Sequence, residues 1–278
     1  MAEVLVPKTL AELLPNINNE EKRITAGCTD VIVGLRSGRI TYKPMIDINE
    51  IEEIKIIYED DDNVYIGSNV PLNKVIHNEL IQKNFSVLKK AIESIGSLQI
   101  RNRATIGGNI QNGSPSGDCI LALTVLRAKV ALRSLSGRRQ VDIKDFIKGP
   151  GRTDLRNDEF IEYIAIPKIF LKYQGYFEKV GLRNAMVISI ASMAVVYKLE
   201  NNLVKDINIA YGAVAPKVLQ LTEVENFLKE KELNRENLTA AGELISRAVS
   251  PIDDVRASAE YRREVCKNLI LRLLKQAP

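Results

Sequence analysis

The sequence predicts an α+β fold, and two observations support this assignment. Strand-like runs alternate with short helical segments near the N-terminus, whereas the last third of the chain reads as successive strands followed by helices. With 278 residues the chain is long enough for one large domain or for two to three small ones. We place boundaries near Ile54 and Ile169, which gives units of residues 1–54, 55–168 and 169–278.

The first unit is expected to form a small parallel sheet. Residues 24–25 and 45–48 are short apolar runs on either side of a glycine turn, and they alternate with short helical segments. Residues 63–68, already within the second unit, then read as a further strand.

The second unit is expected to be rich in helices and to contain one hairpin. Apolar residues recur at helical spacing from Leu72 to Ile95, and residues 119–126 (CILALTVL) are apolar enough for a buried helix. A turn at Ser136–Gly137 joins two strand-like runs, and residues 160–166 form another strand that Pro167 ends.

The third unit is expected to contain a three-stranded antiparallel sheet and helices. The strands are predicted at residues 176–182, 188–199 and 204–214, with a hairpin turn at 200–202. Amphipathic helices are predicted at residues 219–228 and 238–249, followed by a final helix.

The segment of residues 104–118, ATIGGNIQNGSPSGD, is the most informative part of the chain. It holds four glycines, two asparagines and one aspartate, a composition that argues against a core helix or a central strand. Glycine lets main-chain N–H groups approach a ligand closely, and inward-pointing N–H groups bind anions such as phosphate. We therefore interpret residues 104–109, the second glycine bend, as a candidate diphosphate cradle, although GxGxxG and the Walker pattern are both absent.

A similar bend occurs earlier in the chain. Residues 26–30, AGCTD, form the first glycine bend, between one short apolar run and another. A tight turn whose glycines only satisfy positive φ explains either bend alone. Two bends of the same chemistry make a nucleotide site about as plausible as that simpler explanation.

Composition excludes several classes of function. The net charge is +4 and the pI is about 8.8, and charges of both signs are interspersed along the chain. Nucleic-acid binding would instead require a clustered basic stripe with aromatic residues. Arg101 and Arg103 flank the second glycine bend, where they add positive potential near a phosphate or are simply solvated. No run of eighteen apolar residues and no signal leader is present, so we expect a cytoplasmic protein without a membrane span.

Cysteine and histidine are too rare for most catalytic or metal sites. Cys28, Cys119 and Cys266 are scattered, so neither a disulfide framework nor a metal site is expected, and a reducing compartment fits. His77 lies on an expected helix face and is interpreted as structural. The chain therefore offers almost no candidate residues for nucleophilic catalysis, and we predict no catalytic residue and no metal ligand.

Five ordered motifs resemble the FAD-binding medium subunit of the molybdenum hydroxylases, the family of xanthine dehydrogenase and carbon monoxide dehydrogenase. They cover nearly the whole chain: AGCTD at 26–30, QIRNRATIGGN with SPSGD at 99–118, GPGRTDLRNDEFI at 149–161, FEKVGLRNAMVIS at 177–189 and SPIDDVRASAEYRREV at 250–265. The resemblance implies a two-subdomain FAD-binding fold of the PCMH or vanillyl-alcohol oxidase type, followed by a C-terminal domain of the CO dehydrogenase flavoprotein type.

Two positions depart from the family pattern. Cys28 stands where the first bend usually has a second glycine, and it is strained by on the order of 1 kcal/mol if that position needs positive φ. Val187 stands where the family usually has an aspartate, so any hydrogen bond of that aspartate is lost. Neither change touches Gly107 or Gly108, and we expect FAD binding to survive.

The resemblance also implies roles for individual residues. Thr29 and Thr105 donate hydroxyl hydrogen bonds to phosphate, and Asp118 binds ribitol or ribose hydroxyls or caps the helix that follows it. Leu155 packs on the flavin ring, and Lys179 lies near its pyrimidine edge. From the residues alone, a core leucine and an exposed strand lysine are the alternatives. Asn109 braces the second bend. The full set of expected FAD contacts is Ile24, Thr25, Ala26, Gly27, Cys28, Thr29, Asp30, Val31, Ile95, Ala104, Thr105, Ile106, Gly107, Gly108, Asn109, Ser114, Asp118, Leu155 and Lys179.

As a function, the resemblance implies an electron-transfer subunit of a heteromeric oxidoreductase. A large partner subunit carries the molybdenum cofactor, a small one carries two [2Fe–2S] clusters, and FAD on this chain reduces NAD⁺ or another acceptor. A stand-alone flavin oxidoreductase of the same fold and a flavin-less assembly subunit stay open as alternatives.

Overall fold

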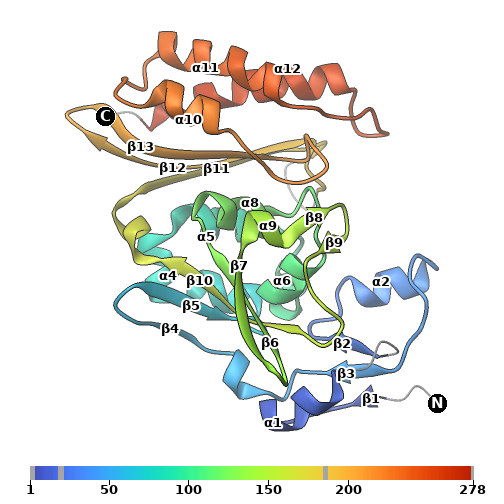
Figure 1. Cartoon of the computed structure of the whole chain (residues 1–278). Helices are drawn as coiled ribbons and strands as arrows, with labels where there is room; N and C mark the ends of the chain where they lie inside the picture. Colours follow the sequence, from blue (N-terminus) through green and yellow to red (C-terminus); the bar gives the residue numbers. More distant parts are fainter. Residues whose placement is uncertain (1–3, 18–21, 184–186, 277–278) are drawn as a thin grey trace.

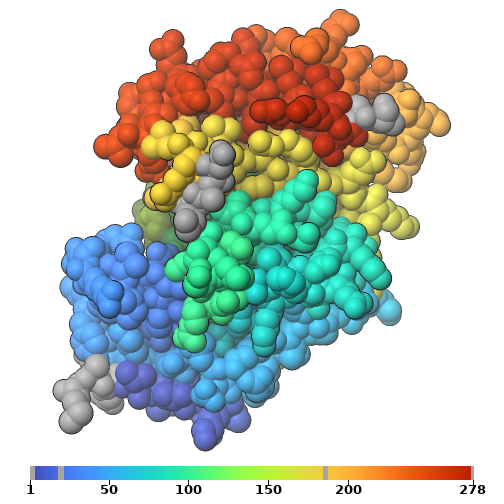
Figure 2. All heavy atoms as spheres, turned by 180° about the vertical axis from the view of Figure 1, so that it is seen from behind, coloured from blue at the N-terminus to red at the C-terminus, as the bar shows by residue number. Residues whose placement is uncertain are grey.

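The structure is a computed structural model that describes residues 4–17, 22–183 and 187–276. The chain is arranged in three stacked parts, with the N-terminal unit at one end and a layer of C-terminal helices at the other (Figures 1 and 2). The middle part lies between them and packs against both neighbours.

The N-terminal unit is a three-stranded parallel sheet in the order β1-β3-β2, which confirms the parallel arrangement predicted from the sequence. Leu13, Ile46, Ile51 and Ile54 are buried in its small core. The elements are β1 (Val4–Leu5), α1 (Leu10–Leu13), β2 (Arg23–Thr25), α2 (Val31–Arg36) and β3 (Met45–Asp47).

The middle part is a five-stranded antiparallel sheet, ordered β4-β5-β10-β6-β7, that packs against a group of short helices. Its strands are β4 (Ile57–Glu59), β5 (Asn63–Gly67), β6 (Lys129–Ser134), β7 (Gly137–Asp142) and β10 (Phe160–Pro167), and β8 (Ile147–Gly149) pairs separately with β9 (Arg152–Thr153). Its helices are α3 (Leu72–His77), α4 (Glu79–Asn84), α5 (Ser86–Glu93), α6 (Leu98–Arg103), α7 (Ile106–Gln111), α8 (Asp118–Val125) and α9 (Ile143–Phe146).

The C-terminal part differs from the sequence prediction in one strand. The sheet has four strands in the order β11-β12-β13-β14, because residues 219–220 pair with β13 before the next helix begins at Thr222. The predicted three-stranded sheet and the predicted helix start at residue 219 were therefore wrong. The elements are β11 (Gln174–Val180), β12 (Ala191–Glu200), β13 (Leu203–Gly212), β14 (Leu219–Gln220), α10 (Thr222–Leu228), α11 (Arg235–Ala248) and α12 (Ala259–Leu269).

The C-terminal sheet is buried on both faces. Ala194 and Val196 of β12 belong to the core of the middle part, where α5 and α8 lie, whereas Met193 and Val195 belong to the core under α10, α11 and α12. Because successive side chains of a strand point to opposite faces, one strand contributes to both cores. This arrangement fixes the C-terminal sheet against α8, whose start carries a predicted site residue, Asp118 (Figure 1). The boundaries near residues 54 and 169 stay predictions.

Candidate functional site

The first glycine bend connects β2 to α2, and hydrogen bonds from the residues that follow β3 hold it in place. The backbone N–H of Ile48 donates to the carbonyl oxygen of Thr25 at 3.0 Å, and Nδ2 of Asn49 donates to that of Ala26 at 2.9 Å. The edge of the parallel sheet therefore fixes where the bend begins.

The bend presents unused donors. Among the residues that the structure describes, the backbone N–H groups of Gly27, Cys28, Thr29 and Asp30 donate to no acceptor. Successive N–H groups without partners are a natural binding site for an anion. Asp30 and Val31 follow at the start of α2. The Asp30 carboxylate lies 3.9 Å from a guanidinium nitrogen of Arg39.

Cys28 adopts the backbone conformation that was suspected from its place in the motif. Its φ is +59°, in the left-handed region where a Cβ is crowded, and its side chain is half-buried. The chain therefore carries strain at the bend that a glycine would relieve.

Replacing this residue tests that strain. Cys28→Gly is expected to raise the free energy of unfolding by on the order of 0.5–1 kcal/mol, because about 1–2 kcal/mol of strain is removed while glycine adds about 0.5–1 kcal/mol of chain entropy to the unfolded state. The measurement is denaturant unfolding of the variant and of wild type. Cys28→Ala is the control, since it removes the thiol but keeps the Cβ, and a gain of stability in that variant would show that strain is not the cause.

The second glycine bend connects α6 to α7 and lies directly against the first. A Cβ on Gly27 would stand 1.9 Å from the carbonyl oxygen of Arg103 and 3.0 Å from Cα of Ala104. The two bends, about 75 residues apart in the chain, therefore touch, and the contact requires a glycine at position 27.

Most N–H groups of the second bend are already used, and within this bend only that of Thr105 donates to no acceptor among the described residues, so the bend supplies fewer main-chain donors than expected. Ile106 donates to Val70 O at 3.2 Å, Gly107 to Ser68 O at 2.9 Å, and Gly108 to the Thr105 hydroxyl oxygen at 3.1 Å. Residues 106–111 form the helix α7, so the expectation that this segment excludes a buried helix was wrong. The Thr105 cap and the backbone bonds to residues 68–70 explain why a glycine-rich helix is stable here.

The two glycines of this bend have different roles. A Cβ on Gly107 would meet Ser68 at 2.7 Å, so this glycine serves internal packing. Gly108 is exposed, and a Cβ there would meet only the Thr105 hydroxyl at 3.1 Å. Next to it, Oδ1 of Asn109 is buried without a partner among the described residues. The second bend thus offers an open surface at Gly108, the Thr105 hydroxyl and an unpaired amide oxygen, and fewer free N–H donors than the first bend.

Arg101 is bound to the protein and is not a freely solvated charge. Its guanidinium donates to the carbonyl oxygens of Glu93, Ile95 and Gly96 and so closes the C-terminal end of α5, whereas Arg103 is exposed. This use of Arg101 had no signal in the sequence.

Asp118 and Lys179 form a buried ion pair, which corrects two alternatives considered for them. Nζ of Lys179 lies 2.6 Å from Oδ2 of Asp118, and their side chains are 10% and 4% exposed. Lys179 is therefore no exposed strand lysine, and the Asp118 carboxylate caps no helix, because α8 begins at Asp118 itself with Gly117 as its cap residue. The pair joins the middle part to β11 of the C-terminal sheet.

Two serines complete this cluster. Ser94 donates to Oδ2 of Asp118 at 3.2 Å, and Ser189 donates to Oδ1 at 3.4 Å. Loss of hydration on burial raises the pKa of the Asp118 carboxyl above its ordinary value, and the Lys179 charge and the two serines counteract part of that rise. Sequence reasoning missed both serines, because each is a single polar residue in a loop.

The remaining predicted residues lie around this cluster or around the bends. Ile95 and Leu155 are partly buried against the middle core, and Ile95 directly follows Ser94. Residues 151–153 lie against Gly113, where Gly151 N donates to Gly113 O at 3.0 Å. Ser114 bonds to Ser116, Thr25 is buried and Ile24 packs on the N-terminal core. The bends lie at the starts of α2 and α7, whereas the ion pair joins the start of α8 to β11.

Val187 lies against Gly181, because a Cβ placed on Gly181 would stand 2.4 Å from Cγ1 of Val187. The neighbouring motif residues 184–186 lie outside the described part of the chain. Within the described residues no group of three or more His, Cys, Asp or Glu side chains is placed to hold a metal ion. No described helix is both long and apolar enough to cross a membrane.

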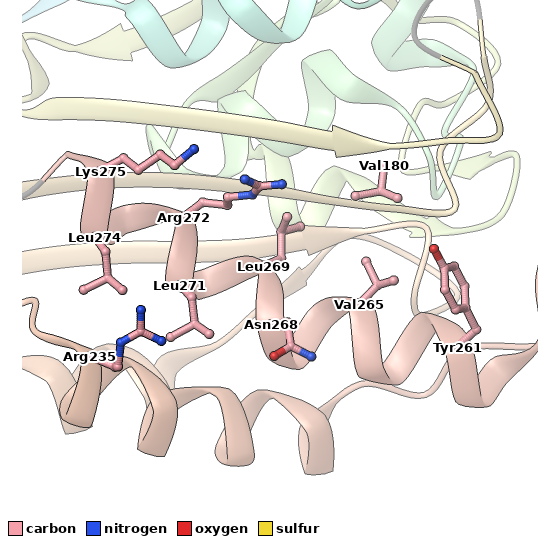
Figure 3. Close-up of a pocket in the computed structure, with 10 residues that line it drawn as sticks. All are labelled: Val180, Arg235, Tyr261, Val265, Asn268, Leu269, Leu271, Arg272, Leu274 and Lys275. Atoms are coloured by element: carbon pink, nitrogen blue, oxygen red, sulfur yellow. The ribbon is translucent and has the colours of Figure 1, made fainter.

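A cleft of about 600 Å³ opens elsewhere, between α11, α12 and the end of the chain (Figure 3). Val265, Leu269 and Leu271 contribute apolar walls, and Arg235 and Arg272 contribute charge. The cleft is lined by none of the predicted FAD contacts. The candidate site therefore consists of the touching pair of glycine bends together with the Asp118–Lys179 ion pair.

Comparisons with known proteins agree with this arrangement. Residues 1–169 match the family described as "FAD binding domain in molybdopterin dehydrogenase", and residues 176–277 match "CO dehydrogenase flavoprotein C-terminal domain". The chain is 33% identical to the glyceraldehyde dehydrogenase medium chain of Sulfolobus acidocaldarius, over 93% of this chain and 91% of that protein. It is 30% identical to the xanthine dehydrogenase FAD-binding subunit of Escherichia coli O157:H7, over 97% and 93%.

A solved structure gives the same result. A carbon monoxide dehydrogenase chain from Hydrogenophaga pseudoflava superposes with a TM-score of 0.94 at 28% identity, covering 99% of this chain and 96% of that one. The first family match covers both glycine bends, and the second covers the C-terminal sheet from residue 176 on. The chain belongs to the FAD-binding medium subunits of the molybdenum hydroxylase family.

Proposed function

We propose that this chain holds FAD in the electron-transfer position of a heteromeric molybdenum hydroxylase. In that complex a large subunit carries the molybdenum cofactor and a small subunit carries [2Fe–2S] clusters, and electrons leave through the FAD on this chain to NAD⁺ or another acceptor. When bound, FAD supplies the redox chemistry, and the protein binds, orients and tunes it.

One observation carries the proposal: unpaired N–H groups at Gly27–Asp30 lie where the first bend touches the second. Donors without partners favour a negatively charged group such as a diphosphate, and Gly108 has no Cβ to obstruct it. Asn109 Oδ1, buried and unpaired, accepts a hydrogen bond from the ligand in this arrangement.

The surroundings of the Asp118–Lys179 pair fit the flavin part. Ile95 and Leu155 supply apolar surface, while Asp118, Lys179 and the two serines supply polar groups in fixed positions. The pair of charges is nearly neutral as a unit, so the two residues orient polar atoms of the ligand without adding a net charge. We propose that these residues contact the flavin.

The test is a titration of the purified chain with FAD, followed by addition of NADH. We expect a yellow protein with one FAD per chain, and reduction of a dye by NADH without other substrate. Co-purification with subunits that contain molybdenum and [2Fe–2S] clusters separates this function from that of a stand-alone oxidoreductase. A chain that stays colourless with excess FAD contradicts the proposal.

Lys179→Met is expected to lower the midpoint potential of the bound FAD by on the order of 30 mV, which for two electrons is about 1.4 kcal/mol. The physical reason is that loss of the ammonium leaves the Asp118 carboxylate unbalanced and disfavours the electron-rich flavin. Since burial already raises the pKa of Asp118, the carboxyl takes up a proton at lower pH and the shift then disappears.

The measurement is spectroelectrochemistry of wild type and variant at several pH values. Lys172→Met, which removes a lysine at an exposed position, is the matched control. A potential that is equal to that of wild type at every pH excludes Lys179 from this role.

A further inference from the structure

Arg262 is a cation inside the C-terminal core. It lies on α12, is only 2% exposed, and is the largest of the fully buried side chains. A buried guanidinium is unfavourable unless several groups compensate for the lost water. Its compensating partners therefore show what the residue holds in place.

These partners come from three separate loops. Nη2 lies 2.7 Å from Oδ1 of Asp254, while Nη1 donates to the carbonyl oxygens of Ile190 at 2.6 Å and of Ala213 at 3.2 Å. The planar guanidinium fork can make these contacts together, which a lysine ammonium on the same backbone cannot do with the same geometry. Arg262 thus ties the C-terminal motif to two loops of the sheet.

The first loop leads to the Asp118 cluster. Ile190 directly follows Ser189, whose hydroxyl donates to Oδ1 of Asp118. The N–H of Ile190 donates at 2.8 Å to the carbonyl of Val180, the residue after Lys179. Fixing the Ile190 carbonyl therefore fixes both the serine and the strand end that meet Asp118.

The second loop reaches the same segment from another side. Ala213 has a φ of +65°, a conformation that is strained for alanine. Its N–H donates at 2.8 Å to the carbonyl of Pro115, three residues before Asp118, while its carbonyl accepts from Arg262. The two hydrogen bonds on either side of the strained residue hold it in that conformation.

We propose that Arg262 is a positioning residue of the FAD site. It lies in the C-terminal core and acts through the Ile190 and Ala213 carbonyls, which together fix residues 114–118 and the Asp118–Lys179 pair. This inference rests on the proposed function, and it gives the motif at residues 250–265 a role at a distance from the ligand.

The test compares FAD binding to Arg262→Ala, Arg262→Lys and the matched control Arg263→Ala, which removes an exposed arginine one position along. For both Arg262 variants we expect the FAD dissociation constant to rise on the order of tenfold, as for a residue coupled to a site through a packed network. Arg263→Ala is expected to bind like wild type. Millimolar guanidinium chloride, but not sodium chloride, is expected to restore the affinity of Arg262→Ala.

A double-mutant cycle with Ser189→Ala separates positioning from general stability. If Arg262 acts through the Ser189 loop, the effects of Arg262→Lys and Ser189→Ala on FAD affinity are not additive. Additive effects, or unchanged FAD affinity in a folded Arg262→Ala or Arg262→Lys variant, overturn the inference. A wild-type chain that binds no FAD refutes the proposed function instead, so the two failures are distinguishable.

Discussion

Asp118→Asn is expected to lower the free energy of unfolding by on the order of 1 kcal/mol, less than the loss of about 3–5 kcal/mol typical of breaking a buried ion pair, because burial already disfavours the carboxylate. The reason lies in what remains, since the Lys179 ammonium stays 10% exposed and keeps only neutral acceptors, among them the carbonyl of Ser94 at 3.4 Å. Denaturant unfolding of the FAD-free protein measures this loss without interference from ligand binding.

The double variant Asp118→Asn with Lys179→Met is the control for this prediction. It removes both charges, so we expect it to be more stable than Asp118→Asn alone. If the single variant is as stable as wild type, the ion pair does not hold the two parts together.

The pH dependence of stability has a sign that follows from the same pair. Because burial raises the folded-state pKa of the Asp118 carboxyl, its contribution to stability is fully present below the unfolded pKa and is lost as the pH rises through the folded value. Asp118→Asn removes this part of the pH profile. Unfolding measured from acid to neutral pH in both proteins shows whether the difference between them has this direction.

Gly27→Ala is expected to give the largest loss of FAD affinity, on the order of 100-fold, together with a loss of about 3 kcal/mol in stability. The added methyl group would stand 1.9 Å from the Arg103 carbonyl oxygen and 2.5 Å from its carbon. Both atoms belong to the backbone, so the bends can relieve the clash only by moving apart. FAD titration and denaturant unfolding measure the two effects separately.

Gly149→Ala is the matched control, because a Cβ there meets nothing within 4 Å and its φ lies outside the left-handed region. It is expected to keep the affinity and stability of wild type. An unimpaired Gly27→Ala would mean that contact between the bends is unnecessary for binding.

The parts of the fold predicted best from the sequence are those that a local pattern encodes. The hairpin of β12 and β13 is an example, with two long apolar strands around Asn201 and Asn202, which both have positive φ. The buried helix α8 is another, since every one of its residues is buried. In both cases periodicity and turn chemistry act within a few residues of each other.

The features that could not be predicted depend on contacts between distant segments. The strand β14 has two residues and exists only because β13 offers a free edge, so its sequence reads as the start of the following helix. The donors of the second bend are used by Ser68 and Val70, and no local pattern shows that this loop lies beside them. Arg262 was visible only as one charged residue of a motif.

The sheet shared between two cores makes the two family-matched regions, residues 1–169 and 176–277, physically inseparable. A cut between them would bare Phe177, Ala194 and Val196 on one fragment and the facing side of α5 and α8 on the other. Fragments with such large apolar surfaces aggregate instead of folding alone. We therefore expect the cofactor-binding half and the C-terminal half to unfold as one cooperative unit. A substitution that destabilises one half is then expected to lower the free energy of unfolding of the other half as well.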